Sequence, residues 1–584
     1  MQVRKLWEKN GDYIAAGLTI LCSIVLISRL FGFYYDLNDD VLIKDIMAGV
    51  YTGTPEAHNM QTLYVLGAFI SLLYRLYRGV PWYGLFLCLC QFGSLYLIGV
   101  RLLQLCSKRS WKMIWLAMLT LFVWSVLLLH MAAVQYTVTC GIMAATAIFL
   151  FMTTERGLSV KTFWYRNIPS GLLVILAFQL RSEMLLLLFP LIALAGFFCW
   201  VEEEVFFRKE HFLKYGAIFG TIVFGMVCSL LIDMAAYSSS EWRSFRNFFD
   251  YRTEVYDFHY DILTDGTHTR QLADLGFSES AQELLANYNY GLDESIDEHA
   301  MARLADYARE YTSRNTDIGV FLSKKTRQYR YRILHMQDGP YSVLMLFGYC
   351  MVFGAGIFAA VASKGKKRFR FLIEALLLMA VRTVLWLYIL LRGRDPVRIT
   401  HPLYLVEFAV LMGMLFLRKQ KVRREYAFYL IAGIWAAAML GMTPGNIRSA
   451  RQDIAQRHSA NNDAQIIAEY CREHADSFYF EDVYSTVSFS QTMFRDVDNS
   501  ISNYDIMGGW ICKSPLYEKK LAYFGITSMA EGLLNSDRVY MIMEESSTDW
   551  LEDYYMEQGI SVEIDQIDFI SKYYGVYKVR EAGE

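Results

Sequence analysis

Residues 34–61 read YYDLNDDVLIKDIMAGVYTGTPEAHNMQ and follow directly on the first long apolar run of the chain. Apolar residues in the middle of this stretch recur at helical spacing, which predicts a short amphipathic helix over 38–50 on the membrane surface. Asp39 and Asp40 open this helix, where its dipole and free N–H groups favour carboxylates. Helix capping is one interpretation of the pair. The other is a general base that is held at the membrane surface and acts on a hydroxyl group.

The composition of the whole chain indicates a membrane protein with large polar regions. Of its 584 residues, 54% are hydrophobic and 20% are charged, and the mean hydropathy is +0.23. A chain of this length made of three or four soluble domains would be less apolar, and a chain made of membrane helices alone would be more apolar. With 56 basic against 59 acidic residues, the sequence lacks the basic excess typical of nucleic-acid binding.

A helix that spans a membrane needs about 20 mostly apolar residues. We expect eleven such helices, near residues 12–34, 82–105, 112–130, 134–153, 168–181, 184–200, 214–236, 340–362, 371–391, 402–417 and 426–443. Basic residues concentrate in alternate connections, at 106–111, 154–167, 201–213, 363–370 and 418–425. The positive-inside rule therefore places the N-terminus in the cytoplasm and the C-terminal region outside. In this topology residues 61–77 form a surface or re-entrant helix, and the loops that carry chemically interesting residues face outside.

Two polar regions divide the chain into four parts. An N-terminal membrane module (1–236), with its first external loop at 34–81, precedes a mainly helical external insertion (237–339) that has capping-box signals at Ser280 and Ser295. Membrane helices return at 340–443. Residues 444–584 alternate helical with β-like runs, which predicts an external α/β domain; the β-like runs are Asp476–Val487, Arg538–Glu544, Ser561–Ile570 and Val576–Arg580. In this domain Ser528 begins another capping box, and Cys471 and Cys512 allow a disulfide.

The order of these features resembles the GT-C superfamily of glycosyltransferases, which includes protein O-mannosyltransferases and lipid A aminoarabinose transferases. The resemblance rests on Asp39-Asp40 after the first helix, the amphipathic stretch to Gly49, the sequence TGTP at 52–55, and two interfacial helices before the helix from Trp82. It implies a mainly α, polytopic membrane protein with about eleven transmembrane helices, a helical external insertion and a C-terminal external α/β domain.

Members of this superfamily use a sugar linked to a polyprenyl phosphate, and an external carboxylate takes the proton from the acceptor hydroxyl. Carried over by position, the resemblance makes Asp39 the candidate base, with Asp40 beside it and Asp36 as a weaker substitute. The lipid phosphate that leaves needs cations near it, because negative charge develops there in a site poor in water.

Candidate phosphate ligands are the external arginines, since arginine recognises phosphate through two hydrogen bonds. Arg392, Arg394 and Arg398 occur within seven residues, against the positive-inside bias. Their alternatives are contact with lipid headgroups and pairing with Asp395. Arg181 interrupts an apolar stretch together with Glu183, and a charge at that depth suggests function unless the two only pair with each other.

Several GT-C enzymes have a second acidic motif in the next external loop. Here that loop offers His130 and Gln135 but no carboxylate, so we expect catalysis without a metal and without another cofactor, and a bridging divalent cation has no support. Arg75, on the predicted surface helix, is a further candidate accessory residue.

The sequence thus predicts an inverting GT-C glycosyltransferase of the cell membrane that moves a sugar from a polyprenyl-phosphate donor to a cell-surface glycan, glycolipid or wall polymer. A surface-polysaccharide polymerase or ligase is an alternative that would not need the aspartate pair. A transporter of lipid-linked glycans is another, and it would show paired hydropathy halves and polar residues at mid-membrane.

Overall fold

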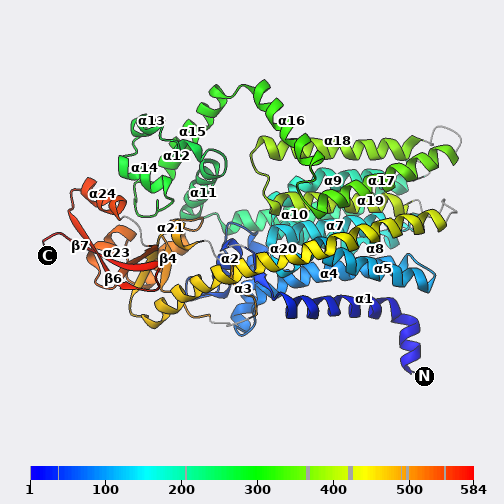
Figure 1. Cartoon of the computed structure of the whole chain (residues 1–584), viewed down its shortest axis with the longest axis horizontal. Helices are drawn as coiled ribbons and strands as arrows, with labels where there is room; N and C mark the ends of the chain where they lie inside the picture. Colours follow the sequence, from blue (N-terminus) through cyan, green and yellow to red (C-terminus); the bar gives the residue numbers. More distant parts are fainter. Residues whose placement is uncertain are drawn as a thin grey trace.

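The computed structural model describes residues 2–36, 38–203, 207–362, 369–417, 425–487, 490–494, 499–544 and 548–583. Long helices run side by side in a bundle, and shorter helices and a sheet gather beyond one end of it, which we call the domain end (Figure 1). Within the described residues, eight helices are long and apolar enough to cross a membrane; they are Asn10–Leu30, Trp82–Gln104, Arg109–Ala132, Ser182–Val201, Lys209–Ala236, Pro340–Ile357, Arg370–Leu391 and Val397–Leu417. The predicted mainly α, multi-pass membrane fold is confirmed.

The element bounds show helices at all eleven predicted positions. The bundle consists of α1 (Gln2–Leu30), α4 (Trp82–Gln104), α5 (Arg109–Phe122), the π-helical turn η1 (Val123–Leu127), α6 (Leu128–Ala132), α7 (Tyr136–Met152), α8 (Val160–Leu180), α9 (Ser182–Val201), α10 (Lys209–Ala236), α17 (Pro340–Ala362), α18 (Arg370–Leu391), α19 (Val397–Leu417) and the first part of α20 (Glu425–Glu473). The predicted break between α8 and α9 is confirmed, because Arg181 takes an extended backbone between them.

Helix α7 forms the centre of the bundle and is buried along almost its whole length. It packs closely on α19, and a Cβ atom at Gly141 would lie 2.4 Å from Pro402. The same contact uses Gly413 of α19, where a Cβ atom would lie 2.4 Å from the sulfur of Met152. Small residues let membrane helices approach in this way.

The first apolar run ends earlier than predicted, because Gly32 takes a left-handed conformation (φ 78°) after α1. Residue 34, the predicted end of the first helix, forms β1 (Tyr34–Tyr35) together with residue 35, and this strand pairs in parallel with β2 (Ala133–Val134). The predicted surface helices are confirmed as α2 (Asn38–Ala48) and α3 (Tyr64–Leu76). A parallel pair of short strands thus joins the segment before α2 to the start of α7.

The polar insertion is helical, as predicted. Its elements are α11 (Ser240–Phe258), α12 (Asp261–Thr264), α13 (Thr269–Asp274), α14 (Glu279–Ala286), α15 (Glu298–Asn315) and α16 (Ile318–Leu334). Two predicted caps are wrong: Ser278 caps α14, while the predicted Ser280 instead binds the carboxylate of Glu557. Likewise Asp297 caps α15, while the backbone N–H of the predicted Ser295 is held in a turn by Asp293.

The C-terminal region contains a five-stranded sheet of order β4-β3-β5-β7-β6, in which β4-β3-β5 are parallel and β6 and β7 antiparallel. Its elements are β3 (Phe478–Glu481), α21 (Val483–Thr486), β4 (Tyr504–Ile506), α22 (Pro515–Tyr523), α23 (Met529–Asn535), β5 (Val539–Glu544), α24 (Asp549–Glu557), β6 (Val562–Phe569) and β7 (Tyr574–Glu581). The predicted runs at 538–544, 561–570 and 576–580 and the cap at Ser528 are confirmed. The run predicted over 476–487 is a strand only at β3 and continues as the helix α21, and β4, only three residues long, was not expected. Cys471 and Cys512 are both buried and free, so no disulfide joins them.

Helix α20 runs without interruption through residue 443, where we expected a membrane helix to end. Its 49 residues, Pro444 among them, lead from the bundle to the sheet (Figure 1). The polar composition after residue 443 suggested a new domain, but polar residues continue a helix where they find partners. Asn446 donates to the carbonyl of Trp124, and Arg457 reaches the segment before α2.

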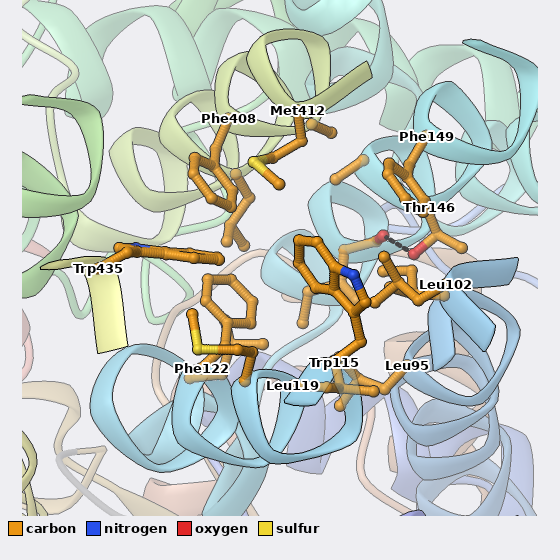
Figure 2. A pocket seen from close by; sticks show the side chains of 17 residues that line it. Leu95, Leu102, Trp115, Leu119, Phe122, Thr146, Phe149, Phe408, Met412 and Trp435 are labelled. Atoms are coloured by element: carbon orange, nitrogen blue, oxygen red, sulfur yellow. Dashed lines mark hydrogen bonds between the residues drawn. The ribbon is translucent and has the colours of Figure 1, made fainter. Parts of the chain in front are cut away.

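An apolar cavity of about 90 Å³ lies inside the bundle, between α4, α5, α7, α19 and α20. Figure 2 shows aromatic side chains around it, among them Trp115, Phe122, Phe408 and Trp435. The hydroxyl of Thr146, one of its few polar groups, donates to the backbone carbonyl of Ile142. None of the predicted site residues is part of its lining, so the candidate site lies elsewhere.

Candidate active site at the domain end of the bundle

The aspartate pair lies in the first turn of α2, and its two members differ sharply in environment. Asp40 is completely buried, and Tyr83 at the start of α4 donates a hydrogen bond to its Oδ1 atom, 2.9 Å away. Burial raises the pKa of Asp40 well above its usual range, and the Tyr83 hydrogen bond counteracts this only in part. Asp40 therefore has a structural role, and a substrate cannot reach it.

Asp39 is half-buried. Its carboxylate forms no hydrogen bond or ion pair with any part of the chain that the structure describes, although it interacts electrostatically with Arg181, Tyr136 and Tyr288. A carboxylate in such surroundings is free to accept a proton from a bound hydroxyl group.

Arg181 lies at the break between α8 and α9. Its guanidinium group donates to Oε1 of Gln61 at 2.5 Å, lies 3.3 Å from the carboxylate of Glu183, and sits 5.3 Å from the ring centroid of Tyr136. The hydroxyl of Tyr136 also donates to Gln61 Oε1, at 3.0 Å. Glu183 is 67% exposed and so neutralises Arg181 only weakly.

Arg398, in the first turn of α19, is the second cation near Tyr136. It is half-buried, interacts electrostatically with Tyr136 and Asp36, and makes no hydrogen bond or ion pair within the described ranges. Asp39, Arg181 and Arg398 therefore all act electrostatically on Tyr136, although 142 or more residues separate Asp39 from either arginine. An unpaired carboxylate and an unpaired guanidinium group at the mouth of a membrane bundle are costly to keep unless a ligand uses them.

The other two predicted phosphate ligands are occupied elsewhere. Arg392 lies 4.3 Å from the ring centroid of Phe258, and Arg394 pairs with Asp257 at 2.9 Å. Both contacts attach the end of α11 to the connection between α18 and α19. The pairing partner suggested by the sequence, Asp395, instead binds Arg332 of α16 at 2.5 Å.

Asp36 is likewise bound, because Arg457 of α20 pairs with its carboxylate at 2.5 Å and donates to its backbone carbonyl at 2.6 Å. Burial raises the pKa of Asp36, and Arg457 counteracts this shift. Sequence reasoning missed Arg457, since nothing in α20 marks it apart from other surface arginines. The pair makes Asp36 a structural group that fastens the segment before α2.

The remaining candidate residues have structural contacts. The Nε2 atom of His130 lies 2.7 Å from Nδ1 of His401, and the Gln135 side chain caps α7 by accepting the N–H of Val138. Arg75 donates to the carbonyl of Pro55 and so holds the loop between α2 and α3. Among the described residues, no group of three His, Cys, Asp or Glu side chains is arranged to hold a metal ion.

The C-terminal region holds the first loop from the other side. The hydroxyl of Tyr51 donates to Asp505 at 2.7 Å, and Lys44 donates to the side chain of Gln491 at 2.7 Å. The backbone N–H of Met493 also donates to the carbonyl of Phe33. The sequence gives no sign of these contacts, because they join residues more than 440 positions apart.

Tyr288 approaches the same site from the insertion. It takes a left-handed backbone conformation (φ 69°), which is rare for a bulky residue. The next residue, Asn289, fixes this turn on the C-terminal region by bonding Asp482 and the N–H of Val483. Burial raises the pKa of Tyr288, the charge of Arg252 counteracts the shift, and the nearby carboxylates of Asp257 and Asp39 add to it.

No protein-family model and no curated protein matches this sequence. Among solved structures, the chain is similar to the crystal structure of ArnT from Cupriavidus metallidurans bound to undecaprenyl phosphate. The sequence identity is 11% and the TM-score is 0.42, over 97% of this chain and 98% of that chain.

Proposed function

We propose that the protein is an integral-membrane glycosyltransferase of the GT-C type. It would transfer a sugar from a polyprenyl-phosphate donor to a cell-surface glycan, glycolipid or wall polymer. The observation that carries this proposal is that Asp39, an unpaired carboxylate, interacts electrostatically with Arg181, and that Asp39, Arg181 and Arg398 all act on Tyr136. A reaction that removes a proton from a hydroxyl and releases a lipid phosphate needs these two kinds of group close together.

In this reaction the carboxylate of Asp39 accepts the proton of the acceptor hydroxyl. The hydroxyl oxygen forms a bond to the anomeric carbon of the donor sugar, and the bond between that carbon and the phosphate oxygen breaks, with inversion at the carbon. The polyprenyl phosphate leaves with the electron pair of the broken bond. Every atom is accounted for without an oxidant or a further reactant.

Arg398 and Arg181 would bind the leaving phosphate and stabilise its charge. Both are arginines, whose planar guanidinium groups match phosphate oxygens and can stabilise the charge that develops on the leaving phosphate. Arg398 is the better primary ligand, since it makes no hydrogen bond or ion pair with the described part of the chain. Arg181 is already oriented by Gln61.

The proposal also includes an orientation, with the N-terminus in the cytoplasm and the domain end outside. The basic connections between α4 and α5 and between α7 and α8 lie at the opposite end of the bundle from α11–α15 and the sheet, in agreement with the positive-inside rule (Figure 1). Reporter fusions test this: a periplasm- or exterior-active reporter after residue 583 should be active, and the same reporter in the 154–159 connection inactive. The reverse pattern contradicts the orientation.

The function is tested by replacing Asp39 in cells that lack the chromosomal copy. Asp39→Asn keeps the shape and removes the base, so the surface glycan profile, measured by mass spectrometry, should match that of cells without the protein. Asp274→Asn, at an exposed position of α13, is the matched control and should restore the wild-type profile. Full restoration by a correctly inserted Asp39→Asn protein overturns the assignment of the base.

A further inference from the structure

Helix α16 connects the external insertion to the membrane helix α17, and it lies beside the spanning helix α18 at the flank of the bundle (Figure 1). The hydroxyl of Tyr329 lies 3.3 Å from Oγ1 of Thr383 and accepts a hydrogen bond from Arg382 at 3.2 Å. Both partners precede the end of α18 at Leu391 by eight or nine residues. At 1.5 Å per residue this distance is about 12 Å, so α16 lies alongside the last part of a spanning helix.

The surface of α16 is unusual for a helix outside the bundle. Tyr329 is its one fully buried side chain, and most of its apolar side chains are open. Ile318 is 78% exposed, Val320 67% and Leu334 71%. An exposed apolar group of this kind next to a membrane helix is typical of a helix that rests in the interface between lipid headgroups and acyl chains.

The charges on α16 are of one sign. Residues 318–337 contain five basic residues and no acidic residue. Arg332 is neutralised by Asp338 and Asp395, but Lys324, Arg327 and Arg330 are exposed and make no hydrogen bond or ion pair with the rest of the described chain. At the N-terminus of the helix, Asp317 is occupied by the backbone N–H groups of residues 319 and 320.

We infer that α16 is an interfacial helix that binds the headgroups of anionic phospholipids in the leaflet around the domain end. Lys324, Arg327 and Arg330 contact the headgroups, and the exposed apolar side chains enter the acyl layer. Charge complementarity selects this occupant, because a neutral lipid surface offers nothing to three unpaired cations in seven residues. The inference does not depend on the proposed glycosyltransferase activity.

The test uses the full chain in lipid nanodiscs, with hydrogen–deuterium exchange of residues 318–334 as the readout. One set of nanodiscs contains phosphatidylcholine alone, and the other contains an equal mixture of phosphatidylcholine and phosphatidylglycerol. Exchange of α16 should be slower in the anionic nanodiscs by at least about fivefold, the effect of one basic side chain at an anionic surface. Equal exchange in both lipids overturns the inference.

Three variants test whether Lys324, Arg327 and Arg330 cause the difference in exchange between the two lipids. The neutral variant Lys324→Gln/Arg327→Gln/Arg330→Gln should lose the difference between the two lipids, and the charge-preserving variant Lys324→Arg/Arg327→Lys/Arg330→Lys should keep it. A variant of α15, with Arg303→Gln/Arg309→Gln/Arg314→Gln, removes the same charge from exposed positions nearby and should also keep it. Exchange in α7 reports whether each variant is folded.

Two results would assign α16 to something else. If the α15 variant loses the lipid difference as fully as the neutral α16 variant, net charge and not α16 is responsible. If soluble polyphosphate protects α16 in phosphatidylcholine nanodiscs while phosphatidylglycerol does not, the partner is a soluble polyanion. Either result contradicts the inference.

Discussion

The hydroxyl of Tyr83 donates a hydrogen bond to Oδ1 of Asp40 at 2.9 Å, and this contact separates the two neighbouring aspartates into different roles. Asp40 is completely buried, whereas Asp39 is half-buried and unpaired within the described part of the chain. A pair that looks equivalent in the sequence therefore contains one supporting carboxyl group and one candidate base.

Replacement of Asp40 should separate these roles. Asp40→Asn keeps an oxygen that accepts the Tyr83 hydrogen bond, so we expect transfer to fall less than about tenfold, against about 10²–10⁴-fold for Asp39→Asn. Asp40→Ala leaves the Tyr83 hydroxyl buried without a partner and should destabilise the fold by about 1–3 kcal/mol. Initial rates and thermal unfolding of the purified variants measure both effects.

The Asp40→Asn variant should also differ from the wild type in how its stability depends on pH. Because the pKa of Asp40 is raised in the folded state, the protonated form is favoured there, and the wild type loses stability as the pH rises through that folded pKa. Asp40→Asn lacks this loss. A thermal-unfolding series in which wild type and variant respond identically to pH would show that Asp40 is not buried as described.

The Asp36–Arg457 ion pair should contribute to the stability of the fold. Arg457→Gln leaves Asp36 without its partner, and we expect a loss of about 2–4 kcal/mol in the free energy of unfolding. Asp36→Asn in the same chain should restore much of this loss, since the unpaired charge is then gone. A double-mutant cycle with no coupling energy would contradict the pair.

Arg398 and Arg394 should differ in their kinetic effects. Arg398→Ala should raise the KM for the donor and lower kcat, by about 2–3 kcal/mol in kcat/KM, because it removes a phosphate ligand. Arg394→Ala should instead loosen α11 through loss of Asp257 and leave the donor KM close to wild type. If Arg394→Ala alone impairs donor use, the phosphate site lies nearer to α11.

A pH-dependent contribution is expected from the sheet. Burial raises the pKa of Glu481 to about 7, Asp505 adds to the shift, and Lys520 counteracts it. Since the folded pKa of Glu481 exceeds the ordinary 4.5, the contribution of this group to stability is highest at low pH. It falls as the pH rises toward and through about 7. The full shift corresponds to roughly 3 kcal/mol. Glu481→Gln should flatten this part of the profile in thermal unfolding.

Local periodicity and charge were enough to predict the membrane helices, α2 and α3, and the break at Arg181, because each depends on residues close in sequence. The same reasoning failed at residues 34–35, whose pairing with residues 133–134 depends on a distant segment. It also placed a boundary at 443 within α20, since composition changes there while the helix continues.

The candidate site likewise has features that could be predicted from the sequence and features that could not. Asp39, Arg181 and Arg398 could be named from their residue types and their place outside the apolar runs. Their shared electrostatic interaction with Tyr136, and the pairing of Arg394 with Asp257 and of Asp36 with Arg457, depend on the tertiary structure. No local pattern distinguishes an arginine that binds a carboxylate of the same protein from one that remains open.

Helix α20 also links the position of the sheet to that of the membrane bundle. Its 49 residues make a rod of about 70 Å, rooted among the membrane helices at one end and in the sheet at the other. A tilt of about 5° at the root would displace the far end by about 6 Å. A swing of the sheet together with α20 would therefore act on the ion pair of Arg457 and, through Asp36, on the turn that carries Asp39.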